Sequence, residues 1–98
     1  MDDEKSVFIA SRLTSGNRVF PSRIEVSKER VSHIKPGIMH SEEESIPINK
    51  VASVTIDSGW IWSEIRIDPS GGSNPIVSHG HRKQDALRIR EMIEHHQD

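Results

Sequence analysis

Apolar and polar residues alternate along several short segments of the chain up to residue 79. A period of two is typical of β-strands with one buried face. The abundant Ile and Val residues favour strands as well, because β-branched side chains fit a pleated surface. Within residues 51–57, we expect Ala52, Val54 and Ile56 together on the buried face. The pattern predicts strands at residues 6–13, 23–27, 30–35, 51–57, 60–68 and 75–79, with an exposed edge strand or a loop at 38–48.

Turn signals separate the expected strands. They are Ser15-Gly16-Asn17, Lys35-Pro36-Gly37, Ser58-Gly59 and the loop DPSGGSN at residues 68–74. Turns of this kind join antiparallel neighbours. The segment at residues 18–21 stays undecided, because Pro21 restricts it to a strand start or an edge.

The hydrophobic period changes after residue 80, which predicts an amphipathic helix over residues 81–97. Its apolar face consists of Ala86, Ile89, Met92 and Ile93. Leu87 lies off this face. Ser78 and Gly80 are the two candidates for the residue that caps the helix start, and no capping box accompanies either.

About seven strands followed by one helix define a mainly β fold. A bent antiparallel sheet covered by a single helix lets a chain of 98 residues bury one apolar core. We therefore expect a single domain over residues 6–98, preceded by a short tail at residues 1–5.

Composition narrows the chemistry and the location. The chain has no cysteine, which excludes disulfides, thiolate nucleophiles and zinc–cysteine sites. The acidic N-terminus differs from a signal peptide, and no apolar run approaches the roughly 20 residues of a membrane span. A formal net charge of −2 argues against general binding of nucleic acid or of anionic lipid. Together these features indicate a cytoplasmic protein.

A pattern of spaced residues runs through residues 24–56, whose sequence is IEVSKERVSHIKPGIMHSEEESIPINKVASVTI. A strand of the form I-x-V-x-x-x-R-V leads to a K-x-G turn and then to a segment of the form I-P-x-x-K-[IV]-x-x-V. The matching residues are Ile24, Val26, Arg30, Val31, Lys35, Gly37, Ile46, Pro47, Lys50, Val51 and Val54. In this pattern, and in the C-terminal helix that follows a Gly-rich hairpin, the chain resembles bacterial pleckstrin-homology-like (PH-like) domains.

The resemblance implies a partly open antiparallel barrel of about seven strands, capped by the C-terminal helix. It also implies no enzymatic activity and no cofactor. Bacterial members of the family generally serve as interaction or assembly modules and often form oligomers. They are not reliably lipid-binding, in contrast to some eukaryotic relatives.

The two tryptophans are the most informative surface candidates. We expect Ile61, Ile65 and Ile67 to point into the core. A period of two then places four residues on the opposite face, namely Trp60, Trp62, Glu64 and Arg66. Exposed Trp side chains are favoured at interfaces, so these four are candidates for an oligomer or partner surface. The alternative is a bulge near Gly59 that turns one Trp inward as a core residue.

Other polar clusters fit structural roles better than chemical ones. His79 and His81 lie close in the chain, but zinc needs three or four convergent ligands, so we expect no metal site there. Glu42, Glu43 and Glu44 fit a solvated edge that resists strand-to-strand aggregation better than a cation site. The chain contains no nucleophile elbow, phosphate loop or HExxH motif, and we expect no enzyme.

Basic residues gather toward the first hairpins. In lipid-binding PH domains, basic residues of that region hold the phosphoinositide headgroup, and the matching candidates here are Arg18, Arg23, Lys28 and Arg30. Glu25 and Glu29 interrupt them, which favours scattered surface charges over a phosphate site.

Two functions remain open at this point. The first is a non-catalytic protein-interaction module that self-associates, at least as a homodimer, by burying an apolar patch around Trp60 and Trp62. An exposed strand edge would be a further contact. The second is a peripheral membrane module that binds anionic headgroups through the basic residues; of the two, we favour self-association.

Overall fold

Within the part of the chain that the structure describes, the fold consists of seven strands, one short 3-10 helix and one α-helix. The computed structural model describes residues 5–11, 19–72 and 74–98. The elements are β1 (Ser6–Ile9), β2 (Arg23–Val26), β3 (Arg30–Lys35), β4 (Glu42–Pro47), η1 (Ile48–Lys50), β5 (Val51–Ser58), β6 (Trp62–Pro69), β7 (Ile76–Arg82) and α1 (Lys83–Gln97). The mainly β fold with a C-terminal helix is therefore confirmed.

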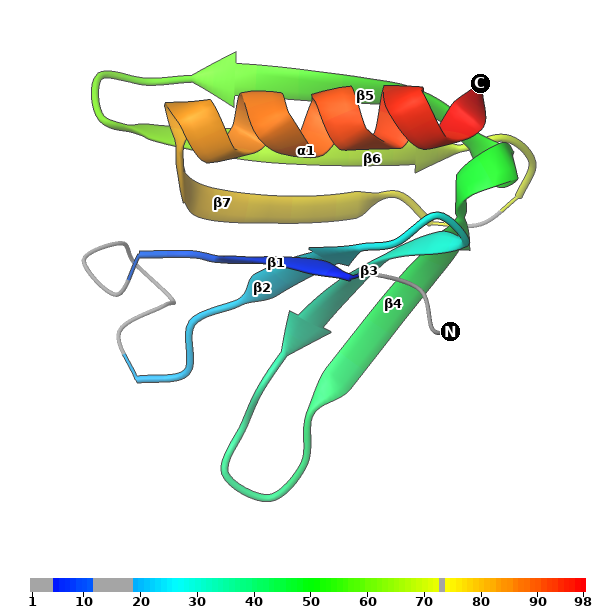
Figure 1. Ribbon diagram of the computed structural model, residues 1–98. Coiled ribbons are helices and arrows are strands. Elements are labelled where there is room, and N and C mark those ends of the chain that lie inside the picture. The colour runs from blue at the N-terminus through cyan, green and yellow to red at the C-terminus, as the bar shows by residue number, and fades with distance from the viewer. Residues whose placement is uncertain (1–4, 12–18, 73) are drawn as a thin grey trace.

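The strands form two antiparallel sheets that do not close into a full barrel. The first sheet has the order β1-β2-β3-β4 and the second has the order β5-β6-β7. The main chain after β1 reaches the second sheet, because the Ser11 N–H donates to the Gly80 carbonyl at 2.8 Å. Figure 1 shows the two sheets converging near η1 and diverging away from it, with α1 running beside β5 and β6.

We call the region around η1 the closed end of the molecule. It contains the β2–β3 turn, η1 itself and the β6–β7 loop. The Ile48 N–H donates to the Glu29 carbonyl at 2.9 Å, and the Ser70 N–H donates to the Lys50 carbonyl at 2.7 Å. These backbone bonds tie the three connections to one another.

The side chain of Gln97 also ties the closed end. Its Nε2 donates to the carbonyls of Ile48 at 3.1 Å and Val51 at 2.9 Å. The end of α1 is thereby fastened to the junction between the two sheets.

We call the opposite region the open end, which consists of residues 19–22, 36–41 and 59–61. These segments belong to the β1–β2, β3–β4 and β5–β6 connections. Because neighbouring strands are antiparallel, alternate connections fall on the same end of each sheet. Figure 1 shows the β5–β6 hairpin beside the start of α1, and the β3–β4 loop at the far edge of the first sheet.

The core lies between the sheets and under α1. It is mostly isoleucine and valine, and its buried members are Ile24, Val26, Val31, Ile46, Ile48, Val51, Ile65, Ile67, Ile76, Ile89 and Ile93. Each fully buried side chain of this size contributes roughly 1.5–3 kcal/mol relative to leaving it exposed. The predicted apolar face of the helix is confirmed, since Ala86, Ile89 and Ile93 are buried and Met92 packs on the core.

Two bulges shift the registers that simple alternation predicts. Between Val51 and Ser53, the pairing of β5 with β6 slips by one residue. As a result Ala52 is exposed and Val51 is buried, so the expected inward position of Ala52 is wrong. In β7, the pairs Ser63 with His81 and Ile65 with Ser78 leave one extra residue in β7.

The β7 bulge depends on a glycine. Gly80 has a φ of 88°, in the left-handed region that favours residues without a Cβ. The bulge turns both Ser78 and His81 inward, where they are buried. Because β7 continues to Arg82, Arg82 precedes the first helical turn, and the expectation of a cap at Ser78 or Gly80 is wrong.

Three further expectations concern the hairpins. Val19 and Phe20 form a bend rather than a strand, and residues 12–18 lie outside the described part of the chain. The edge strand expected within residues 38–48 is present as β4. Ile61 is exposed rather than buried, because it belongs to the β5–β6 turn and not to the inward face of β6.

Candidate functional site

Exposed apolar side chains are concentrated at the open end. Ten large hydrophobic residues of the described chain are exposed, and six of them belong to the three loops of the open end. These six are Val19, Phe20, Ile38, Met39, Trp60 and Ile61. The connections at the closed end instead carry exposed polar residues such as Lys28, Asn49 and Ser70. Trp60 and Ile61 are neighbours at the tip of one hairpin, and exposed apolar side chains that lie together make this tip a candidate contact surface.

The β5–β6 hairpin carries the most exposed of these side chains. The Gly59 N–H donates to the Trp62 carbonyl at 2.9 Å, which closes the hairpin and leaves Trp60 and Ile61 at its tip. Trp60 is fully exposed (104%) and Ile61 is 68% exposed. Neither side chain is turned into the core, so the inward alternative for Trp60 is wrong.

A groove lies directly beside this tip. It has a volume of about 380 Å³. Its lining residues are Ile61, Trp62, Arg82, Lys83 and Gln84. We call it the tip groove. Trp62 is half-buried and pairs across the sheet with Arg82, so the indole and the guanidinium lie on the same face.

The four interface candidates do not all share one position. Trp62, Glu64 and Arg66 follow one another on the outer face of β6, as alternation predicts, and the last two are exposed. The Arg66 Nε donates to Asp68 Oδ1 at 3.0 Å. Trp60 precedes the strand and projects from the turn.

The headgroup candidates are spread over both ends. Arg18 lies outside the described residues. Arg23 begins β2 at the open end, whereas Lys28 and Arg30 flank the β2–β3 turn at the closed end. Arg23 and Lys28 thus lie at opposite ends of the four-residue strand β2. The structure therefore does not bring the described basic candidates together.

Arg23 is already engaged by an acidic neighbour. Its Nε donates to Glu25 Oε2 at 2.9 Å, and Lys5 Nζ lies 3.2 Å from Glu25 Oε1. Burial on its own would raise the pKa of Glu25, but hydrogen bonds and charges from Arg23 and Lys5 outweigh it and lower that pKa. The arrangement fits a surface ion pair better than a phosphate site.

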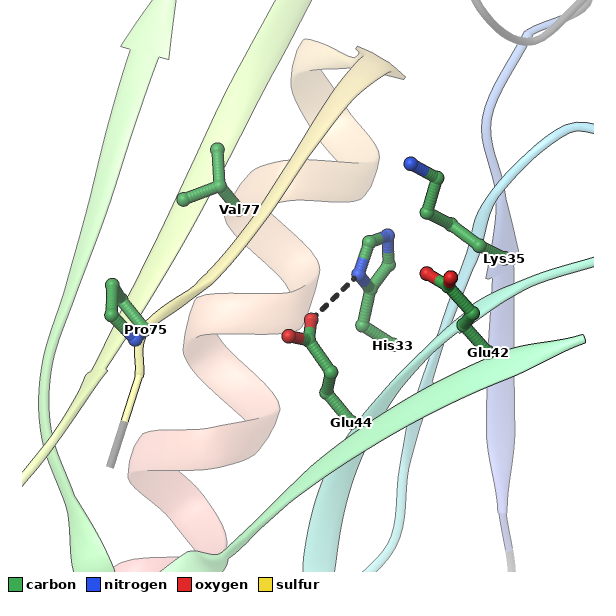
Figure 2. Close-up of a pocket in the computed structure, with 6 residues that line it drawn as sticks. All are labelled: His33, Lys35, Glu42, Glu44, Pro75 and Val77. Atoms are coloured by element: carbon green, nitrogen blue, oxygen red, sulfur yellow. Dashed lines mark hydrogen bonds and ion pairs between the residues drawn. The ribbon is translucent and has the colours of Figure 1, made fainter.

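A second groove, of about 270 Å³, opens between β4 and the start of β7. Figure 2 shows its lining, with His33, Lys35, Glu42 and Glu44 on one side and Pro75 and Val77 on the other. His33 pairs with Glu44 and Lys35 with Glu42 across the β3–β4 ladder. The groove therefore has mixed charge and one neutral imidazole.

His33 is buried although it lines this groove. Its Nδ1 lies 3.4 Å from Glu44 Oε1, and a carboxylate only accepts, so Nδ1 carries the proton in the neutral ring. Its Nε2 is then an acceptor, and it has no hydrogen-bond partner within the described chain. Burial lowers the pKa of His33, while Glu44 opposes that shift and Lys35 reinforces it.

His81 is the second buried histidine, and its position was not expected from the sequence. Its Nε2 lies 2.7 Å from the Ser78 hydroxyl, and its Nδ1 has no partner among the described residues. Burial lowers the pKa of His81 to about 4; Asp85 opposes the shift, and His33 and His79 add to it. This Ser–His pair is sealed from solvent, so it is suited to packing and not to catalysis. The sequence feature that could have predicted the inward position of His81 is Gly80, because an isolated glycine in a strand pattern indicates a bulge.

The described residues were also compared with the requirements of a metal site. Residues 5–11, 19–72 and 74–98 contain no group of three or more His, Cys, Asp or Glu side chains able to hold a metal ion. The β7 bulge also separates the two histidines of the HGH segment, leaving His79 exposed and His81 buried. In the same ranges, no helix is long and apolar enough to cross a membrane.

Comparison with known proteins adds no relative. No family model, no curated protein and no solved structure matches this chain. The candidate site therefore rests on the geometry of the open end alone.

Proposed function

We propose that the chain is a non-catalytic, cytoplasmic interaction module that self-associates through its open end. The observation that carries this proposal is the fully exposed Trp60 beside the exposed Ile61 at the tip of the β5–β6 hairpin. A PH-like family membership is part of the same proposal. It is supported by the order of a four-stranded sheet, a three-stranded sheet and a C-terminal helix.

The energetic argument starts from the cost of leaving an indole in water. A tryptophan buries on the order of 150–250 Å² of surface in an interface, and Trp is among the residue types most enriched at binding hot spots. Trp60 makes no use of that area within its own described chain. Burial against a partner would recover it without disturbing the core, because Trp60 is not part of the core.

The test is solution mass by size-exclusion chromatography with light scattering over a range of concentrations. We expect the wild type to show at least two protomers, and Trp60→Ala to shift toward 11.1 kDa. Val7→Ala is the matched control, since Val7 is an exposed apolar residue on β1, in the other sheet from the hairpin tip. A wild type that stays monomeric at every concentration would overturn the proposal.

A second candidate function is supported by the basic residues behind the apolar tips. Arg23 lines a groove with Phe20, Lys35 lines one with Met39, and Lys83 lines the tip groove with Ile61. Apolar tips backed by cations also suit a peripheral membrane module on anionic lipid. Liposome co-sedimentation at low and high salt tests it: salt-sensitive binding supports this candidate, and no binding at low salt removes it.

A further inference from the structure

We infer that the self-associated form is a two-fold dimer in which Trp60 of each copy occupies the tip groove of the other. The partner is thus a second copy of this chain, and the contact is an aromatic side chain against Arg82 and Lys83. This inference rests on the proposed self-association and deepens it.

The first argument is that the projecting Trp60 side chain and the tip groove lie side by side on one surface. Ile61 belongs both to the hairpin tip and to the lining of the tip groove. A two-fold interface uses the same patch on both copies, so each contact must occur twice. A surface that carries a projecting indole next to a groove of about 380 Å³ meets that requirement with no other chain.

The second argument is that Trp60 does not fill the groove of its own chain. The Gly59 N–H bond to the Trp62 carbonyl holds the turn closed, and Trp60 remains fully exposed in that geometry. Trp62 already forms one wall of the groove beside Arg82. The space next to Trp62 is therefore left for an incoming side chain.

The third argument is charge complementarity. The face of an indole carries partial negative charge and attracts a guanidinium or an ammonium group within about 6 Å. Arg82 and Lys83 supply both groups at the groove, and both are exposed. An aromatic ring suits this groove better than a basic side chain would, because the groove itself is cationic.

The decisive experiment uses two variants that break opposite halves of the contact. Trp60→Ala removes the projecting ring and keeps the groove. The double variant Arg82→Gln with Lys83→Gln removes the cations of the groove and keeps the ring. We expect the dissociation constant of the dimer to rise at least 100-fold for the first variant and at least 10-fold for the second. Lys28→Gln with Arg30→Gln makes the same charge change at the closed end and should leave the constant within twofold.

Mixing the two variants separates this inference from self-association in general. A heterodimer of the two retains one complete contact, whereas the Trp60→Ala homodimer retains none. In an equimolar mixture, an affinity-tagged Trp60→Ala protein should therefore retain the groove variant at a concentration at which it does not retain untagged Trp60→Ala. Failure of the mixture to recover association, in a wild type that is dimeric, would overturn the two-fold contact and leave self-association standing.

Fluorescence gives a second readout, in a variant that replaces the groove-wall residue Trp62 with another aromatic residue and keeps Arg82 and Lys83. The chain has two tryptophans, so Trp62→Phe leaves Trp60 as the single indole emitter. We expect its emission to move to longer wavelength on dilution, as the ring leaves the partner's groove for water. Emission typical of a water-exposed indole at every concentration, in a protein that is dimeric by light scattering, would also overturn the inference. A wild type that is monomeric throughout would instead remove the proposed function beneath it.

Discussion

The closed end and the open end of this molecule each consist of short connections between secondary-structure elements. The connections at the two ends differ in the contacts that they make. At the closed end, three connections are joined by backbone bonds, such as that from Ile48 to Glu29, and by the side chain of Gln97. At the open end, three connections project apolar side chains into solvent. One end therefore holds the two sheets together, and the other exposes the apolar side chains on which the proposed self-association rests. Substitutions at the two ends should separate stability from association.

The largest difference should come from one substitution made at both ends. Ile48→Ala removes a buried side chain at the closed end, and we expect it to lower the free energy of unfolding by about 2–5 kcal/mol. Ile38→Ala makes the same chemical change on a side chain that is 83% exposed, and should change it by less than about 0.5 kcal/mol. Urea unfolding measures both. Equal losses at the two ends would contradict the comparison.

Acid should weaken the molecule through its buried histidines. The pKa of His81 falls from 6.5 to about 4 on folding, and that of His33 is also lowered, so the unfolded chain binds protons that the folded chain does not. Stability therefore rises with pH between about 4 and 6.5, and is lost as the pH falls through that window. For His81 alone the loss is about 3 kcal/mol, at about 1.4 kcal/mol per pKa unit.

The measurement for this prediction is the free energy of unfolding in urea at pH 7 and pH 4.5. His95→Gln, which removes an exposed histidine instead of a buried one, is the matched control. The groups near His81 that bear on the result are Asp85, His33 and His79. A pH profile that is flat between pH 4 and pH 7 would contradict the neutral burial of both rings.

Loss of the hydrogen bonds that hold the end of α1 should have an intermediate effect on the free energy of unfolding. Gln97→Ala removes two hydrogen bonds to backbone carbonyls, and we expect a loss of about 1–2 kcal/mol of unfolding free energy. Thermal and urea unfolding both report it. Asp98→Ala, one residue further along, is the control and should be close to neutral. A Gln97 variant as stable as the wild type would mean that water replaces these bonds at no cost.

The smallest effect on stability is expected at the β3–β4 loop. Met39 is 88% exposed, so Met39→Ser should change the unfolding free energy by less than about 0.5 kcal/mol. Any change should instead appear in association or in lipid binding, which light scattering and co-sedimentation measure. A loss of more than about 1 kcal/mol would show that Met39 packs on the protein and is not part of a contact surface.

The periodicity of the apolar residues was sufficient to predict most of the fold from the sequence. The alternation of β6 correctly placed Ile65 and Ile67 inward, and the helical spacing correctly placed Ile89 and Ile93 on the core. These positions follow from local geometry, because each strand or helix face is determined by its own neighbours along the chain.

The sequence predictions were wrong at positions whose burial depends on pairing with a neighbouring strand. The bulge at Ala52 and the inward turn of His81 depend on how β6 pairs with its neighbours, which no local period records. Ile61 was misplaced because the hairpin turn is one residue longer than alternation assumed. The exposure of Trp60 was one of two alternatives that the sequence left open. The tip groove was not expected, since Arg82 and Lys83 reach it from the junction of β7 and α1.

The bonds made by Gln97 also bear on how the chain folds while it is being synthesised. Gln97 and Val51 lie 46 residues apart, so the junction between the sheets leaves the ribosome well before the side chain that fastens it. At typical elongation rates of 5–20 residues per second, that interval is roughly 2–10 s. Within that interval β5–β7 is completed first, at Arg82, and its apolar face has no helix to cover it until α1 has been made.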